Sequence, residues 1–473
     1  MPSQTVSARA VDPGDELATA LAAIPVSLGL SREFPSAVTA EAERIAAIGP
    51  LPELDRTELE FVTIDPAGST DLDQAMALAR DGDGYRVHYA IADVPAFVEP
   101  GGAIDAEARR RGQTVYAPDG RTPLHPAVIS EGAASLLPGQ LRGAYVWDFE
   151  LDAAASVTAV RVYRARVTSR TQYDYETAQQ LIDGAGAPTL LALLKEVGEK
   201  RVLLEEARGG ASLRVPETEV EVVDGRYVIE RRSPLPVESW NAQLSLMTGM
   251  EAARLMLSAR VGILRTMPEA DDEAVARFRR QAAALGHPWS STARYGDYLR
   301  GLDTADPRQL AIMHAAASLF RGAGYSAFDG TAPENTMQAA VAAPYAHVTA
   351  PLRRLVDRFA LVLCEAVSAG EQVPGWVREA LPELPSIMNG SNSLAGQVDN
   401  RALDTVEAAM LRDRVGEQFD ATVLSSGKGS STVQLDDPAV TAKCDAELEP
   451  GARARVRLVA AEIATGTVRF AAL

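Results

Sequence analysis

The sequence is poor in cysteine, with only Cys364 and Cys444 among its 473 residues. Neither belongs to a Cys-x-x-Cys pair, which excludes a cysteine-based zinc site and is typical of proteins from a reducing compartment. No run of about 18 apolar residues occurs, so we expect no segment that spans a membrane. The N-terminus, MPSQTVSARAVDPGD, lacks a basic start followed by an apolar core. We therefore expect no secretory signal and a cytoplasmic location.

Basic residues are also in deficit, because 46 Lys and Arg stand against 64 Asp and Glu and leave a net charge of −18. Proteins that coat nucleic acid without specificity need Lys and Arg to meet the phosphates, so this balance argues against that class. The negative net charge is still compatible with an enzyme that binds nucleic acid in a channel lined by a few locally placed arginines. The arginines are indeed clustered, at residues 109–111 and 353–354.

Three carboxylates stand close together in residues 61–75, which read FVTIDPAGSTDLDQA. The first four of these residues are β-branched or aromatic and predict a buried strand, with Asp65 at its end. A Pro- and Gly-containing turn follows. Asp71 and Asp73 are two apart, so in an extended chain they share a face. One turn is therefore expected to bring all three acids to one place.

Such a cluster needs a counter-charge, because two charges about 4 Å apart repel by about 4 kcal/mol at an effective dielectric near 20. A proton or a cation would relieve this repulsion. Ligands that are all oxygen suit Mg²⁺, and also Mn²⁺, better than zinc. The alternative is that the acids cap turns and face water. The spacing alone leaves both interpretations open.

The same segment resembles the signature of the ribonuclease II/R family of 3'→5' exoribonucleases, approximately I-D-x-x-x-A-x-D-[FL]-D-D-A. Asp65, Asp71 and Asp73 match its first three catalytic acids, and Gln74 stands in place of the fourth. The resemblance implies that these four residues hold Mg²⁺, with Gln74 as an uncharged ligand through its carbonyl oxygen. Residues 89–130 continue the resemblance, including the run EARRRGQTVYAP.

A second pattern lies at residues 344–357, PYAHVTAPLRRLVD, which predicts the opening of an amphipathic helix with Pro351 in its first turn. Arg353 and Arg354 would then lie at the helix N-terminus, where the helix dipole disfavours cations. Two arginines tolerated there suggest a bound anion. An exposed arginine pair without a ligand is the alternative.

The family carries H-F-T-S-P-I-R-R-Y at this place, and His347, Thr349, Pro351, Arg353 and Arg354 match it. The resemblance implies that Arg353 binds the RNA phosphate near the scissile bond and stabilises the transition state. By the same resemblance His347, Thr349 and Arg354 are expected to contribute to RNA binding.

Two tyrosines, Tyr116 in V-Y-A-P and Tyr173 in R-T-Q-Y-D, lie where the family places tyrosines that line its RNA channel. Stacking of a base on an aromatic ring contributes about 1–3 kcal/mol and tolerates any sequence. Core packing with a hydrogen-bonded hydroxyl is the alternative for each. The family's paired glutamates, in E-E-x-M-x-x-A-N, are replaced here, which leaves Asn241 and Gln243 as candidates to read the ribose 2'-hydroxyl.

The chain is expected to fold as an α+β protein in three units. Residues 1–55 predict a small helical N-terminal unit, either helix-turn-helix-like or a packing arm. Residues 56–415 carry strands followed by helices, which indicates an RNB-type catalytic domain of mixed sheet with surrounding helices. Short alternating runs in residues 416–473 predict a small β-barrel, which by resemblance is an OB-fold RNA-binding domain.

The function that these expectations favour is a metal-dependent, processive 3'→5' exoribonuclease that hydrolyses single-stranded RNA to nucleoside 5'-monophosphates. We expect a monomer that uses Mg²⁺, with Mn²⁺ as a substitute, and no nucleotide cofactor or membrane partner. One alternative is a catalytically weak RNA-binding protein on the same scaffold, suggested by Gln74. Another is a Mg²⁺-dependent phosphohydrolase of small substrates.

Overall fold

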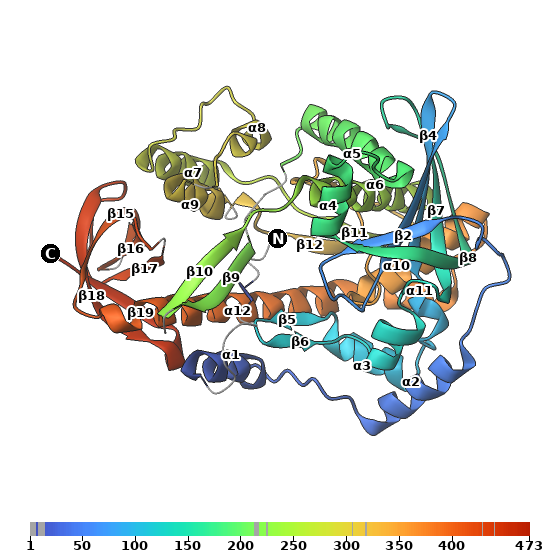
Figure 1. The fold of residues 1–473 in the computed structure, drawn as a ribbon, viewed down its shortest axis with the longest axis horizontal. Coiled ribbons are helices and arrows are strands. Elements are labelled where there is room, and N and C mark those ends of the chain that lie inside the picture. Colours follow the sequence, from blue (N-terminus) through green and yellow to red (C-terminus); the bar gives the residue numbers. More distant parts are fainter. Residues whose placement is uncertain are drawn as a thin grey trace.

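The computed structural model describes residues 6–7, 15–211, 217–223, 226–304, 306–316, 319–427, 429–438 and 440–473. Figure 1 shows two strand-rich bodies at opposite ends of the molecule, with helices between and around them. The long helix α12 (Leu384–Leu411) runs along the molecule towards the C-terminal body. No helix within the described ranges has both the length and the apolar character needed to cross a membrane.

The first body is a closed barrel of five strands, one of which is the start of the acidic segment. Its strands are β2 (Phe61–Asp65), β3 (Gln74–Asp81), β4 (Gly84–Ala92), β7 (Leu141–Leu151) and β8 (Val157–Asp174). The sheet is mixed, as predicted, because β2 pairs with β8 in parallel while the other pairs are antiparallel. Closure depends on the length of β8, which pairs with β7 along residues 157–168 and with β2 along residues 169–174.

Alternate side chains of the barrel strands pack on opposite sides, as a pleated sheet requires. On β4, Val87, Tyr89 and Ile91 join a large cluster with helices that follow the barrel in sequence, whereas Ala90 and Ala92 join a second cluster. The helices of the large cluster are α4 (Tyr175–Asp183), α5 (Thr189–Arg208), α6 (Pro236–Ala259) and α10 (Leu355–Ala369). This packing confirms the predicted α+β arrangement, while the closure of the sheet was not predicted.

The C-terminal body is a second closed barrel of five strands, which confirms the predicted small barrel. Its strands are β15 (Gln418–Gly427), β16 (Ser430–Leu435), β17 (Thr441–Cys444), β18 (Arg453–Glu462) and β19 (Thr467–Ala472). Its two aromatic residues, Phe419 and Phe470, contact each other edge to face in the barrel core, with ring centroids 5.8 Å apart. Neither ring is therefore exposed for stacking on a base.

The N-terminal helices form as predicted, but they belong to different cores. Helix α1 (Glu16–Ser27) packs its apolar side against α12, in a cluster that includes Leu21 and Val406. Helix α2 (Ser36–Ile48) instead buries Val38 against the first barrel. The two helices are thus packing elements of larger bodies, which favours the packing-arm interpretation.

The remaining described elements complete the connections between these bodies. They are β1 (Val6–Ser7), η1 (Val94–Ala96), α3 (Ala103–Arg111), β5 (Val115–Ala117), β6 (Gly120–Thr122), η2 (Val128–Ala133), β9 (Glu217–Val223), β10 (Arg226–Arg232), β11 (Val261–Thr266), α7 (Asp272–Ala284), α8 (Tyr295–Arg300), α9 (Pro307–Ala316), β12 (Gly324–Asp329), β13 (Met337–Gln338), β14 (Ala343–Pro344), α11 (Gly375–Ala380), η4 (Arg412–Arg414) and η5 (Ile463–Thr465).

The contact between α12 and the C-terminal barrel predicts a pH-dependent stability. Burial raises the pKa of Glu407 on α12 to about 8 from 4.5, against an opposing interaction with the Thr441 backbone. The folded state therefore holds this proton more tightly, so the stabilisation is complete below pH 4.5 and is lost as the pH rises to about 8. We expect Glu407→Gln to raise the melting temperature at pH 8.5 by about 1–3 °C and to leave it unchanged at pH 4.5.

The matched control is Glu43→Gln on the exposed side of α2, which removes the same charge without relieving burial. Thermal unfolding followed by circular dichroism measures both variants. If Glu407→Gln changed the melting temperature by the same amount at pH 4.5 and at pH 8.5, this result would contradict a raised pKa of Glu407 in the folded state.

Candidate active site

The acidic segment leaves the barrel at the end of β2 and returns at the start of β3. Ser135 fixes the connection, since its hydroxyl accepts a hydrogen bond from the Leu72 amide at 2.9 Å and donates one to the Thr70 carbonyl at 2.7 Å. Leu72 is fully buried in the second core cluster. In an extended segment the flanking side chains, Asp71 and Asp73, then face away from that core.

The Asp73 side chain contacts two residues of the second predicted pattern, Leu352 and Arg353, although about 280 residues of chain separate it from them. Its Oδ1 accepts a hydrogen bond from the Leu352 amide at 2.8 Å, and its Oδ2 lies 3.5 Å from Nε of Arg353. The Asp73 side chain is 7% exposed, whereas that of Arg353 is 42% exposed. A buried carboxylate thus anchors a guanidinium that remains open to an incoming anion.

The segment that presents Arg353 is a turn rather than the first turn of a helix. Helix α10 begins at Leu355, four residues after the predicted start, and Arg354 is its extended N-cap residue. Asp357 holds the turn, because its carboxylate accepts from the Ala350 amide at 2.7 Å and from the Arg354 guanidinium at 2.9 and 2.7 Å. These bonds satisfy groups outside the helix and delay its start.

The charges of the cluster are incompletely compensated. Burial, reinforced by Asp71, raises the pKa of Asp65 to about 7, and the Arg353 guanidinium opposes this shift. Burial likewise raises the pKa of Asp73 to about 8 against the effect of Arg353. Within the part of the chain that the structure describes, the Asp65 carboxylate has neither a hydrogen bond nor an ion pair. An unpartnered, partly buried carboxylate is stabilised by a proton or a cation.

The donor chemistry of this cluster fits a hard divalent cation, since Asp65 and Asp73 offer carboxylate oxygens in a region of excess negative charge. The arrangement itself is not a closed cage. Among the described residues, no three His, Cys, Asp or Glu side chains are grouped to hold a metal ion. Asp71 is instead paired with Arg121 at 2.6 Å.

Gln74 was predicted as the fourth metal ligand, but the structure commits its side chain to the framework. Its Nε2 donates to the Thr349 carbonyl at 2.7 Å, and its Oε1 accepts from the Tyr89 hydroxyl at 2.6 Å. The amide therefore ties β3 to β4 and to the segment that leads to Arg353. A carboxylate could accept from Tyr89 but could not donate to Thr349, which explains an amide at this position.

Three predicted RNA-binding residues also belong to the framework. Thr349 is 2% exposed, and its hydroxyl pairs with Ser245 at 2.8 Å. Arg354 is neutralised by Asp357. His347 pairs through Nδ1 with the Tyr325 hydroxyl at 2.8 Å. These contacts orient the turn around Arg353 and engage the Thr349 hydroxyl, the His347 Nδ1 atom and the Nε and Nη2 atoms of Arg354.

The two predicted tyrosines have different surroundings. Tyr116 on β5 is 44% exposed overall. Burial of its hydroxyl raises the pKa of that group, Arg353 opposes this shift, and Asp71 and Asp73 add to it, so the hydroxyl end of the ring lies within the field of the acidic cluster. Tyr173 on β8 pairs with Ile64 and packs partly buried against the large core cluster. Only Tyr116 has the exposure that stacking on a base requires.

Tyr175, the first residue of α4, was not indicated by any motif in the sequence. Burial raises the pKa of its hydroxyl and Asp65 raises it further, while Asn241 opposes the shift. Asn241 donates to the Ile64 carbonyl at 3.1 Å, which brings α6 to the site. Gln243 does not reach it, because this side chain is buried and donates to Glu205 at 2.5 Å. The helical spacing of the two α6 residues explains the difference, since neighbours two apart face different directions.

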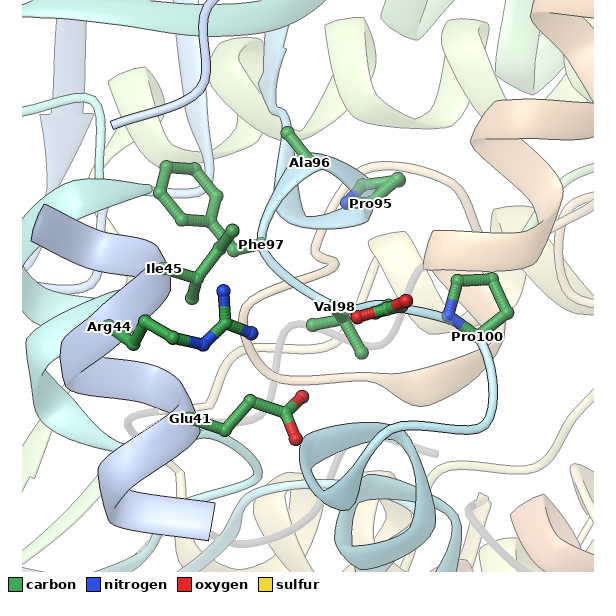
Figure 2. Close-up of a pocket in the computed structure, with 9 residues that line it drawn as sticks. Glu41, Arg44, Ile45, Pro95, Ala96, Phe97, Val98 and Pro100 are labelled. Carbon is green, nitrogen blue, oxygen red and sulfur yellow. The ribbon is translucent and has the colours of Figure 1, made fainter. Parts of the chain in front are cut away.

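A cavity of about 310 Å³ lies elsewhere, between α2 and residues 95–100. Figure 2 shows Glu41 and Arg44 of α2 facing the segment with Val98. Glu41 is already engaged there, because it accepts a hydrogen bond from the Ala103 amide at 2.7 Å, at the N-terminus of α3. No residue of the acidic cluster lines this cavity.

Comparison with known proteins gives a consistent result over most of the chain. The family described as "RNB domain" matches residues 54–368, and the family described as "RNase II-type exonuclease C-terminal S1 domain" matches residues 417–473. Ribonuclease R of Escherichia coli is 26% identical over 410 residues, which are 81% of this chain and 50% of that protein. The probable exosome complex exonuclease RRP44 of Caenorhabditis elegans is 28% identical over 355 residues, which are 70% of this chain and 36% of that protein.

Solved structures share the fold at lower identity. The apo form of Mycoplasma genitalium RNase R has a TM-score of 0.83 at 17% identity and covers 97% of this chain and 78% of that one. Yeast Ssd1, described as a pseudonuclease, has a TM-score of 0.71 at 17% identity, over 95% of this chain and 58% of that one. The chain thus spans at most half of the two curated relatives above. Because the RNB match extends over more than half of the sequence, this chain belongs to the RNB-domain family.

Proposed function

We propose that the chain is a divalent-metal-dependent, processive 3'→5' exoribonuclease that hydrolyses single-stranded RNA to nucleoside 5'-monophosphates. The observation that carries this proposal is the contact between buried Asp73 and exposed Arg353. Two patterns that are distant in sequence and separately typical of such nucleases meet at one point. The relatives named Ribonuclease R, and the structure of Mycoplasma genitalium RNase R with ribose-methylated single-stranded RNA, support RNA as the partner.

The residues take distinct roles in this proposal. Arg353 binds the phosphate beside the scissile bond and stabilises the charge that develops on it. Asp65, Asp71 and Asp73 would hold the cation, which is Mg²⁺ or Mn²⁺ and would supply an activated water and a Lewis acid when bound. Tyr116 stacks on a base near the 3' end, which suits an enzyme that accepts any base.

A second candidate is an RNA-binding protein on the same scaffold with little or no turnover. Two observations favour it: the amide of Gln74 in place of an acid, and the occurrence of this fold in yeast Ssd1, described as a pseudonuclease. Fold alone does not decide between these candidates.

The first test measures turnover on RNA of 20 nucleotides, labelled at its 5' or its 3' end, with Mg²⁺. We expect 5'-labelled RNA to pass from full length to a short end product without a ladder of intermediates, 3'-labelled RNA to release labelled nucleoside 5'-monophosphate at once, and EDTA to abolish both. Asp73→Asn and Arg353→Ala should each reduce the rate by about 10²–10³-fold, because the first removes a charged ligand of the cation and the second removes the cationic partner of the reacting phosphate. Asp55→Asn and Arg378→Ala remove exposed ion pairs at 3.3 and 2.6 Å and serve as matched controls.

Three outcomes would contradict the proposal. A shift of RNA in a native gel without turnover would support the binding protein. Release of inorganic phosphate without dependence on RNA length would support a phosphohydrolase of small substrates. Full activity of Asp73→Asn would show that the acidic cluster takes no part in the reaction.

The framework role of Gln74 predicts an effect on stability rather than on rate. Gln74→Glu keeps the acceptor for Tyr89 but places a carboxylate oxygen against the Thr349 carbonyl, where Nε2 now donates. We expect the free energy of unfolding to fall by about 1–3 kcal/mol, measured by urea denaturation. Gln397→Glu on an exposed part of α12 is the control. Unchanged stability together with a faster rate would show instead that the position serves the metal.

A further inference from the structure

The hairpin of β5 and β6 places the guanidinium of Arg121 against the acidic cluster. Tyr116 on β5 pairs directly across the hairpin with Arg121 on β6. The Arg121 guanidinium contacts Asp71 at 2.6 Å through Nη1 and Glu131 at 2.8 Å through Nη2. One guanidinium thus bridges an acid of the candidate metal site and an acid outside it.

Glu131 is held in place independently of Arg121. It lies in the short η2 segment, and its Oε2 accepts a hydrogen bond from the Thr70 hydroxyl at 2.9 Å. Its side chain is 32% exposed, compared with 16% for Asp71 and 27% for Arg121. The better-solvated partner of the guanidinium is therefore Glu131.

The charges of the cluster show what this bridge does. Three carboxylates face two guanidiniums: Arg353 lies against Asp73, Arg121 lies against Asp71, and Asp65 has no ion pair among the described residues. A guanidinium and a divalent cation compete when both need the same carboxylate oxygens, because each requires close contact with them. Arg121 therefore occupies a ligand that the cation would use.

We propose that Arg121 is a positioning residue of the metal site, which holds Asp71 in the metal-free protein and competes with the divalent cation for it. Glu131 retains the guanidinium when the cation takes Asp71, so the pair sets the metal affinity. This inference rests on the proposed function, since it concerns the cation of the same site.

The test is a Mn²⁺ titration of the whole chain without RNA, with free Mn²⁺ followed by electron paramagnetic resonance. Arg121→Gln should lower the dissociation constant by about 3- to 10-fold, because the competing cation is gone. Glu131→Gln should raise it by about 3- to 10-fold, because the guanidinium then has only Asp71. Arg121→Lys keeps the charge but cannot bridge two carboxylates through separate nitrogens, so it should lower the dissociation constant in the same direction as Arg121→Gln and by less.

The dissociation constant should change in opposite directions in the two neutral variants, and this distinguishes the proposed role from a purely structural one. If Arg121 and Glu131 only fix the hairpin, both neutral variants should weaken Mn²⁺ binding or leave it unchanged, and either result overturns the inference. Arg32→Gln is the control, since Arg32 holds Asp119 at the tip of the same hairpin at 2.7 Å without touching the acids. It should leave the dissociation constant unchanged.

The proposed function and this inference fail in different ways. Wild-type protein that binds no Mn²⁺ at millimolar concentration would overturn the metal site and the inference with it. Binding by the wild type that Asp65→Asn abolishes, but that Arg121→Gln leaves unchanged, would overturn the inference alone. Circular dichroism of each variant confirms that it is folded before the comparison is made.

Discussion

The buried carboxylate of Asp73 is the constraint on which the site depends. It accepts the Leu352 amide and contacts the Arg353 guanidinium, so one side chain joins the first barrel to the segment that precedes α10. Burial makes this carboxylate costly to ionise, and the adjacent guanidinium lowers that cost. The same desolvation strengthens any interaction with a cation or a phosphate placed there, because charges interact more strongly away from water.

The surrounding polar residues serve mainly to hold Arg353 where Asp73 can meet it. Gln74 ties the Thr349 carbonyl to β3, and Asp357 fastens both the Ala350 amide and Arg354. Each of these bonds satisfies a group in a segment that is neither helix nor strand, as buried irregular backbone requires. The result is a rigid turn that leaves one guanidinium exposed, which is the preorganised geometry that electrostatic stabilisation of a phosphate needs.

Local patterns in the sequence were sufficient to predict the α+β class, the C-terminal barrel, the strand that ends at Asp65 and the two motifs that meet at the site. They did not show that β8 is long enough to close the first barrel, because closure depends on pairing with two strands distant in sequence. They also did not show the hydrogen-bond partners of Gln74, Thr349 and Arg354, because those partners are distant in sequence or depend on how the turn folds. The contact of Arg121 with Asp71 depends on the hairpin's tertiary placement, and no motif in the sequence indicated it.

The most direct test of the account is a crystal structure of the protein with Mn²⁺ and a short single-stranded RNA that resists hydrolysis, using the anomalous signal of manganese. The account predicts a manganese peak about 2.0–2.3 Å from an oxygen of Asp65. It also predicts that the Arg353 guanidinium contacts the phosphate nearest the RNA 3' end and that the Tyr116 ring lies against a base. An RNA 3' end bound away from the acids, with Arg353 facing solvent, would contradict it.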